Sequence, residues 1–220
     1  MAPPTTIIFD LDGTLVHSAP DLHASANTML GELGRAPLDL DQVTSFIGNG
    51  VPKLVERVLR ASGGIPRDDG ASALARFMQV YSANLAVLTR PYPGVVAQLE
   101  EIAAHGIAMG VCTNKPVQPA GELCEGLNLA RFFGAITGGD SHERKKPDAL
   151  PLLKTIAEIG GTPERCLYVG DSETDYLTAR AANVRFALFS GGYLKQPIEE
   201  FDGALVFHDW AKAALSELQL

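Results

Sequence analysis

Short apolar runs alternate with amphipathic segments through most of the chain, and this alternation restricts the fold more than any other feature. The candidate strands lie at 6–10, 107–113, 133–139, 166–171, 185–191 and 203–207. Several of them are apolar along their whole length, which is typical of parallel strands buried on both faces. Helical patterns over 94–106, 150–160 and 176–184 separate them. We therefore expect an α/β fold with a doubly wound, mainly parallel, Rossmann-like sheet.

One section interrupts this alternation. Between Ser18 and Leu88 no convincing strand occurs. Apolar residues recur there at helical spacing in three stripes, which run over 22–33, 54–59 and 74–88. Turn-like segments that contain proline bound the section at 17–20 and 90–94. We expect a helical cap domain over 17–89, inserted into an α/β core domain made of 1–16 and 90–220. The two connections between them would then form a hinge.

The first apolar run ends in two carboxylates. Asp10 and Asp12 are separated only by Leu11, and a break at Gly13-Thr14 follows. Along a strand, residues two apart point to the same side. Two like charges placed together oppose each other's ionisation unless a cation or a shared proton intervenes. Either the pair is an accident of an edge strand or a positive group belongs beside it.

Polar residues also stand at the ends of the later runs. The second ends in 113–115 (Thr-Asn-Lys), the basic residues 144–146 follow the third, and the fourth ends in Asp171 and Asp175. In open α/β sheets, ligands bind beyond the carboxyl ends of the strands. The combined carboxylates, hydroxyl, amide and ammonium are suited to holding one hard cation and one phosphoryl group.

The ordered motifs DxDGT, Thr, Lys-Pro and GDxxxD resemble those of the haloacid dehalogenase superfamily of phosphotransferases, and the helical insert is similar to its small helical cap. The resemblance implies that Asp10 is a nucleophile that forms an aspartyl-phosphate, and that Asp12 is the general acid and base. It also implies a Mg²⁺ ion held by Asp10, the Asp12 backbone carbonyl and Asp171, with Asp175 acting mainly through water. Lys146 would neutralise both Asp10 and the phosphoryl charge.

The resemblance further implies contacts to the substrate or its phosphoryl group from Thr14, Thr113, Asn114, Asn49, Gly50 and Lys53. Several of these assignments have structural alternatives. Asp12 could form an Asx turn, Asp175 could be mainly a helix N-cap, and the turn 48–50 could simply join two helices. Lys145 could take the place of Lys146.

The presence of Asp12 argues against one class of reaction, because dehalogenases of this superfamily lack an equivalent residue and need no metal. Phosphonate-cleaving relatives also replace it and use a cap lysine, for which Lys53 would be the candidate, so phosphate-ester chemistry is favoured. Segments 18–22, 46–59 and 113–115 resemble the bacterial phosphoglycolate phosphatases, which implies hydrolysis of 2-phosphoglycolate. Two departures from their pattern are His17, where relatives usually carry Asp, and Ala149; the first bears on the hinge.

Three alternatives stay open. A sugar-phosphate mutase similar to β-phosphoglucomutase would share every catalytic residue, and a phosphatase for another sugar phosphate would use the same core. A binding protein that has kept the fold without turnover would be expected to have lost motif residues. The motifs are complete here, which favours an enzyme of small phosphorylated metabolites.

Composition limits the partners and the location. The chain has 220 residues and a net charge of −8, which argues against nucleic acid or an anionic membrane as the main partner. We expect no secretion signal and no membrane helix. The three cysteines lack CxxC spacing, and two of them, Cys112 and Cys166, lie in apolar strand-like runs, which predicts reduced, buried thiols there and a cytoplasmic protein. The sequence leaves open a monomer or a homodimer, and Mg²⁺ or Mn²⁺.

Overall fold

Six parallel strands form one sheet in the order β5-β4-β1-β6-β7-β8 in the computed structural model, which describes residues 3–212. The strands are β1 (Thr6–Phe9), β4 (Ala108–Cys112), β5 (Ala135–Thr137), β6 (Cys166–Gly170), β7 (Arg185–Phe189) and β8 (Leu205–Phe207). The doubly wound parallel sheet predicted from the sequence is confirmed. The predicted core domain also included 1–2 and 213–220, which lie outside the described residues.

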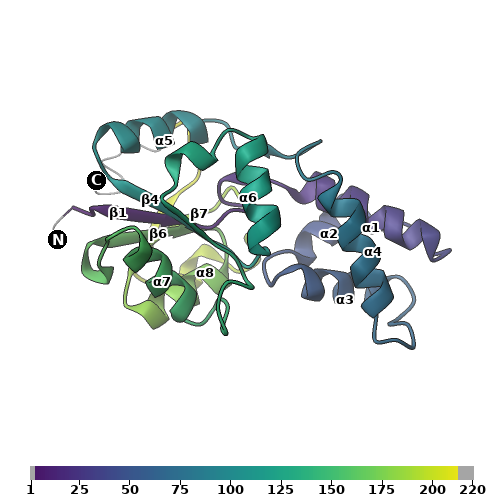
Figure 1. Ribbon diagram of the computed structural model, residues 1–220. Coiled ribbons are helices and arrows are strands. Elements are labelled where there is room, and N and C mark those ends of the chain that lie inside the picture. The colour runs from purple at the N-terminus through teal and green to yellow at the C-terminus, as the bar shows by residue number, and fades with distance from the viewer. Residues whose placement is uncertain (1–2, 213–220) are drawn as a thin grey trace.

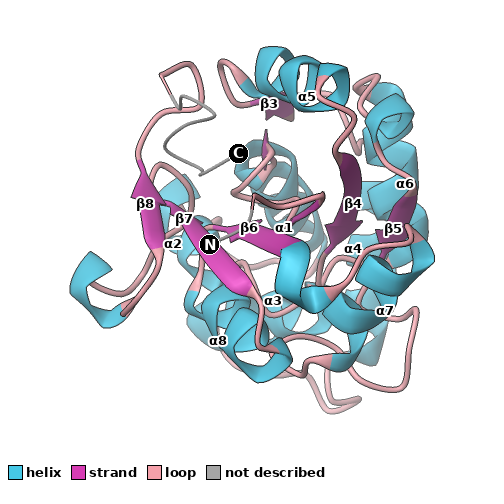
Figure 2. Cartoon of the chain, turned by 90° about the vertical axis from the view of Figure 1, so that its left-hand side faces the viewer, coloured by secondary structure: helices cyan, strands magenta, loops and turns pink. Residues whose placement is uncertain are grey.

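Helices cover both faces of this sheet, as Figures 1 and 2 show. One face carries α5 (Val95–Ala104) and α6 (Val117–Gly126), and the other carries α7 (Leu150–Glu158) and α8 (Glu173–Ala182). Short 3-10 helices occur at η1 (Ala130–Phe132), η2 (Pro163–Arg165) and η3 (Ile198–Glu200). Adjacent residues of β1 point to opposite faces of the sheet: Ile7 packs with α5 and α6, whereas Ile8 packs with α7 and α8. This burial on both faces explains the wholly apolar strands.

The interrupting section forms four helices, α1 (Ala19–Glu32), α2 (Leu40–Phe46), α3 (Val51–Ala61) and α4 (Ala71–Ser82). They pack around a hydrophobic core of their own, to which Tyr193 of the α/β part also contributes. The helical stripes predicted from the sequence supply this core, except that Leu33 and Leu88 lie outside the helices and are exposed. The helical character predicted for this section is therefore confirmed, while the ends of its apolar stripes extend too far.

A two-stranded antiparallel ribbon joins the two parts, β2 (Val16–His17) paired with β3 (Arg90–Pro91). Strands of two residues are too short to give a periodic sequence signal. Beside the ribbon, the buried Asp21 carboxylate accepts hydrogen bonds from the Leu88 N–H at 3.0 Å and the Thr89 N–H at 2.7 Å. We propose that this ribbon is the hinge. The cap boundary at 17 falls in β2, the boundary at 89 falls one residue before β3, and both stay a prediction.

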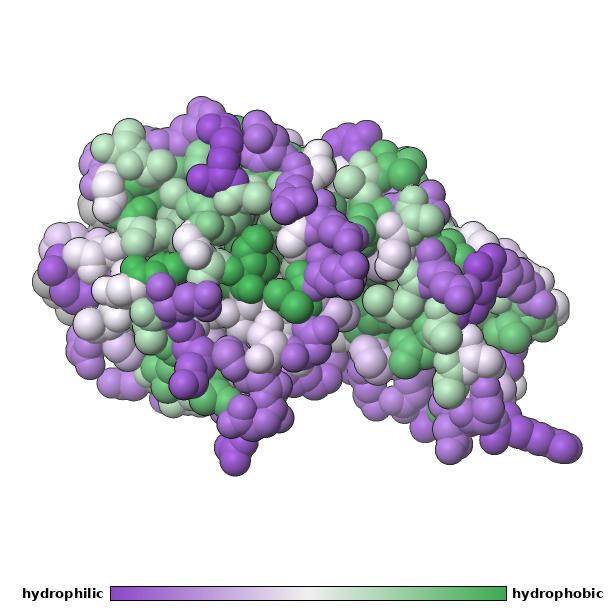
Figure 3. Space-filling model, viewed as in Figure 1, coloured by the Kyte–Doolittle hydropathy of each residue, from purple (hydrophilic) through white to green (hydrophobic). Residues whose placement is uncertain are grey.

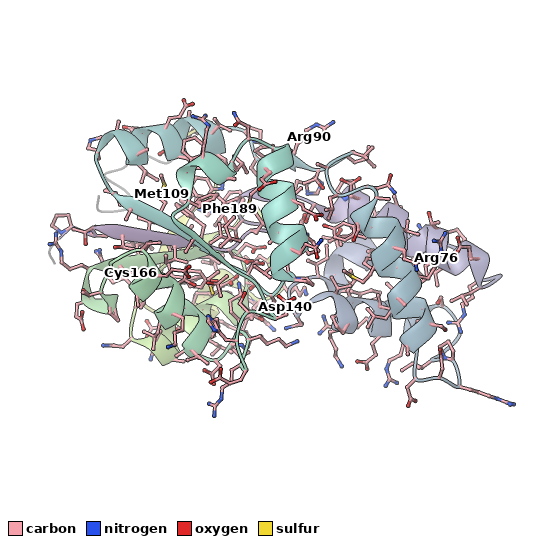
Figure 4. The ribbon with its side chains drawn as sticks, in the orientation of Figure 1. Arg76, Arg90, Met109, Asp140, Cys166 and Phe189 are labelled. Atoms are coloured by element: carbon pink, nitrogen blue, oxygen red, sulfur yellow. The ribbon has the colours of Figure 1, made fainter. Side chains whose placement is uncertain are left out.

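The space-filling view in Figure 3 shows two lobes with a mainly polar surface and smaller apolar areas between the polar side chains. In Figure 4, Arg76 lies on α4 in the helical lobe, while Asp140 lies at the end of the sheet that is turned toward that lobe. Within residues 3–212, none of the helices combines the length and the apolar character that crossing a membrane requires. All three cysteines are buried free thiols, as the sequence predicted for Cys112 and Cys166.

Candidate active site

Three carboxylates converge where β1 and β6 end. One oxygen each from Asp10, Asp171 and Asp175 lies within 4.8 Å of the other two, and all three residues are buried. Asp10 follows β1, Asp171 follows β6, and Asp175 stands in the first turn of α8. Gly13, with φ at +90°, allows this close approach: a Cβ there would lie 2.3 Å from Asp171 Oδ2. The break after the DxD pair therefore makes room for the carboxylate from β6.

The electrostatics of this cluster fit a hard divalent cation. Burial, which is the largest cause, and the charge of Asp175 together raise the pKa of Asp10 to about 6 against the opposing effect of the nearby Lys146. Burial, followed by the charges of Asp175 and Asp10, raises the pKa of Asp171 well above its usual value. Crowded, desolvated carboxylates resist ionisation, and a bound cation would remove that penalty. Carboxylate oxygens are the ligands that Mg²⁺ and similar ions prefer.

The two carboxylate oxygens of Asp175 accept hydrogen bonds from different groups. Its Oδ1 accepts from Lys146 Nζ at 2.6 Å and from the Tyr168 hydroxyl at 2.8 Å. Its Oδ2 accepts from Ser172, with which it forms the capping box of α8. The N-cap of α8 is therefore Ser172 and not Asp175, which is the third helical residue of the capping box and also belongs to the carboxylate cluster. Because both oxygens already accept hydrogen bonds, Asp175 is better placed to orient the cluster than to bind an ion by itself.

Lys146, and not Lys145, faces the first carboxylate. Lys146 Nζ lies 2.9 Å from Asp10 Oδ1 and its side chain is buried. Burial alone would lower the pKa of Lys146, but the charges of Asp10 and Asp175 raise it, so the ammonium stays charged. Lys145 is exposed and donates to the Asn49 carbonyl oxygen at 3.2 Å.

The end of β4 supplies neutral donors. Thr113 is buried, and its Oγ1 accepts from the Lys115 N–H at 3.2 Å, which leaves the hydroxyl proton free to donate. The Asn114 N–H has no acceptor in the part of the chain that the structure describes. The Asn114 amide Nδ2 donates to the carbonyl oxygens of Gly48 and Lys146, each at 3.2 Å. One hydroxyl and one backbone N–H at this strand end can therefore bind a phosphoryl oxygen.

A cavity lies between these groups and the helical lobe. The α/β part contributes its polar side, including Asp10, Asp12 and Thr113. The helical part contributes its apolar side, through the side chains of Leu22, Ile47, Val51 and Leu54. Such a cavity would surround a small molecule that places a charged group on the side of the α/β part.

The loop that precedes α3 is held against the α/β part by three successive carbonyl groups. The oxygens of Ile47, Gly48 and Asn49 accept hydrogen bonds from Lys195, Asn114 and Lys145, respectively. Each donor is a side chain of the α/β part. The structure therefore shows the cap closed over the cavity.

Three of the residues expected to contact the substrate lie elsewhere. Thr14 donates its hydroxyl to Asp171 Oδ1 at 2.9 Å and so holds a carboxylate of the cluster. Asn49 lines a neighbouring cleft and donates to Thr174 Oγ1 at 3.3 Å. The Lys53 side chain is 47% exposed and pairs with Glu56 at 2.7 Å. This arrangement gives no support to substrate contacts from Thr14, Asn49 or Lys53.

Sequence reasoning included Lys115 only in the polar segment 113–115 and gave it no role of its own, whereas in the structure it lines the cavity and is buried. Its ammonium pairs with the Asp12 carboxylate at 3.1 Å and also contacts the hydroxyl of Tyr81 in α4. A charged residue directly after a buried strand was the available signal, since lysine is seldom buried unless it is paired. The partner in α4 carried no sequence signal.

Gly50→Ala tests the closed loop. Gly50 has φ +87° and ψ 162°, and a Cβ there would lie 3.1 Å from the Asn114 carbonyl oxygen. This backbone region is almost exclusive to glycine and costs other residues about 1–3 kcal/mol. We expect Gly50→Ala to raise KM for a small phosphate ester by about tenfold, equivalent to about 1.4 kcal/mol. Lys53→Ala is the matched comparison, and steady-state kinetics should show little change; a larger effect of Lys53→Ala would contradict the placement seen here.

The fold and this site define a class of protein. The family model of haloacid dehalogenase-like hydrolases matches residues 7–189, and the chain belongs to that family. A phosphoglycolate phosphatase of Cereibacter sphaeroides (strain ATCC 17029 / ATH 2.4.9) is 48% identical over 206 residues, which cover 92% of this chain and 94% of that protein. That of Rhodospirillum rubrum is 42% identical over 214 residues, covering 94% and 88%, respectively.

A solved structure agrees with these relatives. The crystal structure of a predicted phosphoglycolate phosphatase from Haemophilus somnus 129PT superimposes with a TM-score of 0.92 at 29% identity and covers 100% of both chains. Together, the family and these relatives identify the chain as a phosphoric monoester hydrolase similar to phosphoglycolate phosphatases. The superfamily resemblance inferred from the ordered motifs is confirmed.

Proposed function

We propose that this protein is a Mg²⁺-dependent phosphatase that hydrolyses 2-phosphoglycolate to glycolate and phosphate through a phosphorylated Asp10. The observation that carries the proposal is the buried cluster of Asp10, Asp171 and Asp175 beside Lys146. A bare cluster of this kind would repel a phosphate ester. With a cation bound and Lys146 charged, the negative charge of the carboxylates is offset and a phosphate ester can bind beside them.

The residues suit the two halves of such a reaction. Asp10, the Asp12 backbone carbonyl and Asp171 would hold Mg²⁺, which offsets negative charge when bound. The Asp10 carboxylate attacks phosphorus and the ester bond to the leaving oxygen breaks. Thr113 and the Asn114 N–H donate to the phosphoryl oxygens. Asp12, which lines the cavity, gives a proton to the leaving oxygen and then takes one from the water that hydrolyses the phosphoryl-Asp10 bond.

The choice of ester rests on the relatives and on the cavity. The curated relatives at 42–48% identity are named phosphoglycolate phosphatases. The apolar side chains from the helical lobe leave little room beyond the phosphoryl site, which favours a short leaving group over a sugar. Three buried free thiols support a cytoplasmic location. We propose that the enzyme acts on a small metabolite in carbohydrate metabolism, as a monomer or a homodimer.

The proposal is tested by measuring phosphate release over a panel of esters with Mg²⁺, ranked by kcat/KM. We expect 2-phosphoglycolate to rank first, and all activity to disappear with a chelator and return with added Mg²⁺. β-Glucose 1-phosphate should release phosphate slowly or not at all. Quantitative conversion of that ester to glucose 6-phosphate would identify a mutase instead, and full activity in the chelator would contradict the role of the carboxylate cluster.

A further inference from the structure

Lys115 is a buried cation whose three N–H groups are all engaged. Its side chain is 1% exposed. Its Nζ lies 3.1 Å from Asp12 Oδ1 and 3.2 Å from Asp12 Oδ2, and it also donates to the Tyr81 hydroxyl. An ammonium withdrawn from water is costly unless it is paired and hydrogen-bonded. Asp12 and Tyr81 together meet that requirement, and they account for the position of the ammonium.

Asp12 depends on the same contact. Among the described residues, Lys115 is the only side chain that donates a hydrogen bond to the Asp12 carboxylate, which is 13% exposed. Because the ammonium contacts both carboxylate oxygens, it restrains rotation of the group about its last side-chain bond. A proton donor must be within hydrogen-bond reach of the atom that it protonates. The direction in which Asp12 points is therefore set by Lys115.

The third partner of Lys115 comes from the other lobe. Tyr81 belongs to α4, is fully buried, and stacks on Phe77 with 5.7 Å between ring centroids. The Lys115 ammonium also lies 4.7 Å from the centre of the Tyr81 ring. Lys115 itself follows β4 in the α/β lobe. Moving the lobes apart would thus remove one hydrogen bond and one aromatic face from the ammonium and admit water to it.

We propose that Lys115 is a positioning residue that holds Asp12 for proton transfer, and that Tyr81 makes this positioning depend on closure of the cap. The proposal rests on the proposed phosphatase function. Asp12 is then correctly oriented only when the helical lobe has covered the cavity and excluded bulk water. A substrate bound to the open form would meet an Asp12 that is poorly aligned with the leaving oxygen.

The test compares esters that differ in their need for a proton. Ethyl phosphate and 2-phosphoglycolate have poor leaving groups and require the proton, whereas p-nitrophenolate leaves without it. The kcat/KM value reports the steps up to departure of the leaving group. We expect Lys115→Met to lower kcat/KM by about 10²-fold for the first two esters and to change it little for p-nitrophenyl phosphate. Tyr81→Phe should give the same pattern with a loss of about tenfold, as for one hydrogen bond to a charged group.

Lys154→Met, which changes an exposed lysine of α7, is the matched control and should behave as wild type. Equal losses on all three esters would show a merely structural role and overturn the proposal. A loss confined to 2-phosphoglycolate would make Lys115 a direct partner of the substrate carboxylate, which also overturns it. If the melting curve shows that Lys115→Met does not fold, the kcat/KM values of Tyr81→Phe on the three esters alone test the proposal. Wild-type protein inactive on every ester would instead refute the proposed phosphatase function.

Discussion

Asp10→Asn is expected to lower phosphate release by at least about 10⁴-fold, the scale of loss when an enzyme loses its nucleophile. Asparagine has the same shape as aspartate, but its amide is a far weaker nucleophile than a carboxylate. The side chain lies among two other buried carboxylates, so removing its charge also relieves repulsion, and Lys146 keeps its ion pair with Asp175 at 2.6 Å. We therefore expect the melting temperature to be equal to or above that of wild type while activity is lost.

The measurement is phosphate release from 2-phosphoglycolate, together with a melting curve for each variant. Asp41→Asn provides the control, because Asp41 is an exposed residue in the first turn of α2. It should retain wild-type kinetics. If Asp10→Asn kept a tenth of the wild-type rate, Asp10 would not be the nucleophile.

Lys146→Met is expected to reduce both stability and activity. Its ammonium contacts Asp10 at 2.9 Å and Asp175 at 2.6 Å, and all three side chains are buried. Removing one partner of a buried ion pair leaves a charge without compensation and costs about 3–5 kcal/mol. We also expect kcat to fall by about 10²–10³-fold, as when a preorganised group that stabilises developing charge is removed.

Lys145→Met is the comparison for this variant. Lys145 is exposed and reaches only the Asn49 carbonyl oxygen. A surface change of this kind alters stability by about 0.5 kcal/mol or less. Melting curves and kinetics of the two variants, in the same buffer and at the same Mg²⁺ concentration, decide which lysine faces the reacting phosphate. Larger losses in Lys145→Met would reverse the assignment made from the geometry.

The sheet was predictable because its strands are buried on both faces, which leaves wholly apolar runs in the sequence. Each strand is shorter than the run from which it was predicted, and residues such as Asp10 and Asp171 lie just past the last residue of their strands. Helix α6 was not anticipated. Its first turn contains Pro119, and only four of its ten residues are buried: Pro119, Ala120, Leu123 and Cys124. The ribbon β2–β3 pairs residues that lie more than 70 positions apart, and no local pattern shows such pairing.

The carboxylate cluster was also predictable, because carboxyl ends of adjacent parallel strands meet at one edge of the sheet. The contacts of individual side chains were not. Lys145 and Lys146 are adjacent in the sequence, and only the fold shows which one is buried. Thr14 was expected at the phosphoryl group but holds Asp171, because the turn at Gly13 brings the two residues together. The contact of Tyr81 with Lys115 joins two lobes, and the sequence gives no sign of how they dock.

Trapping the phosphorylated enzyme tests the central claim most directly. In Asp12→Ala, p-nitrophenyl phosphate can still phosphorylate Asp10, because its leaving group needs no proton, but hydrolysis of the intermediate lacks its base. We expect a burst of one p-nitrophenolate per active site, followed by slow turnover. Mass spectrometry of the acid-quenched protein should find one phosphoryl group on the peptide that contains Asp10. Turnover without a burst, with Asp10 unmodified throughout, would contradict the account.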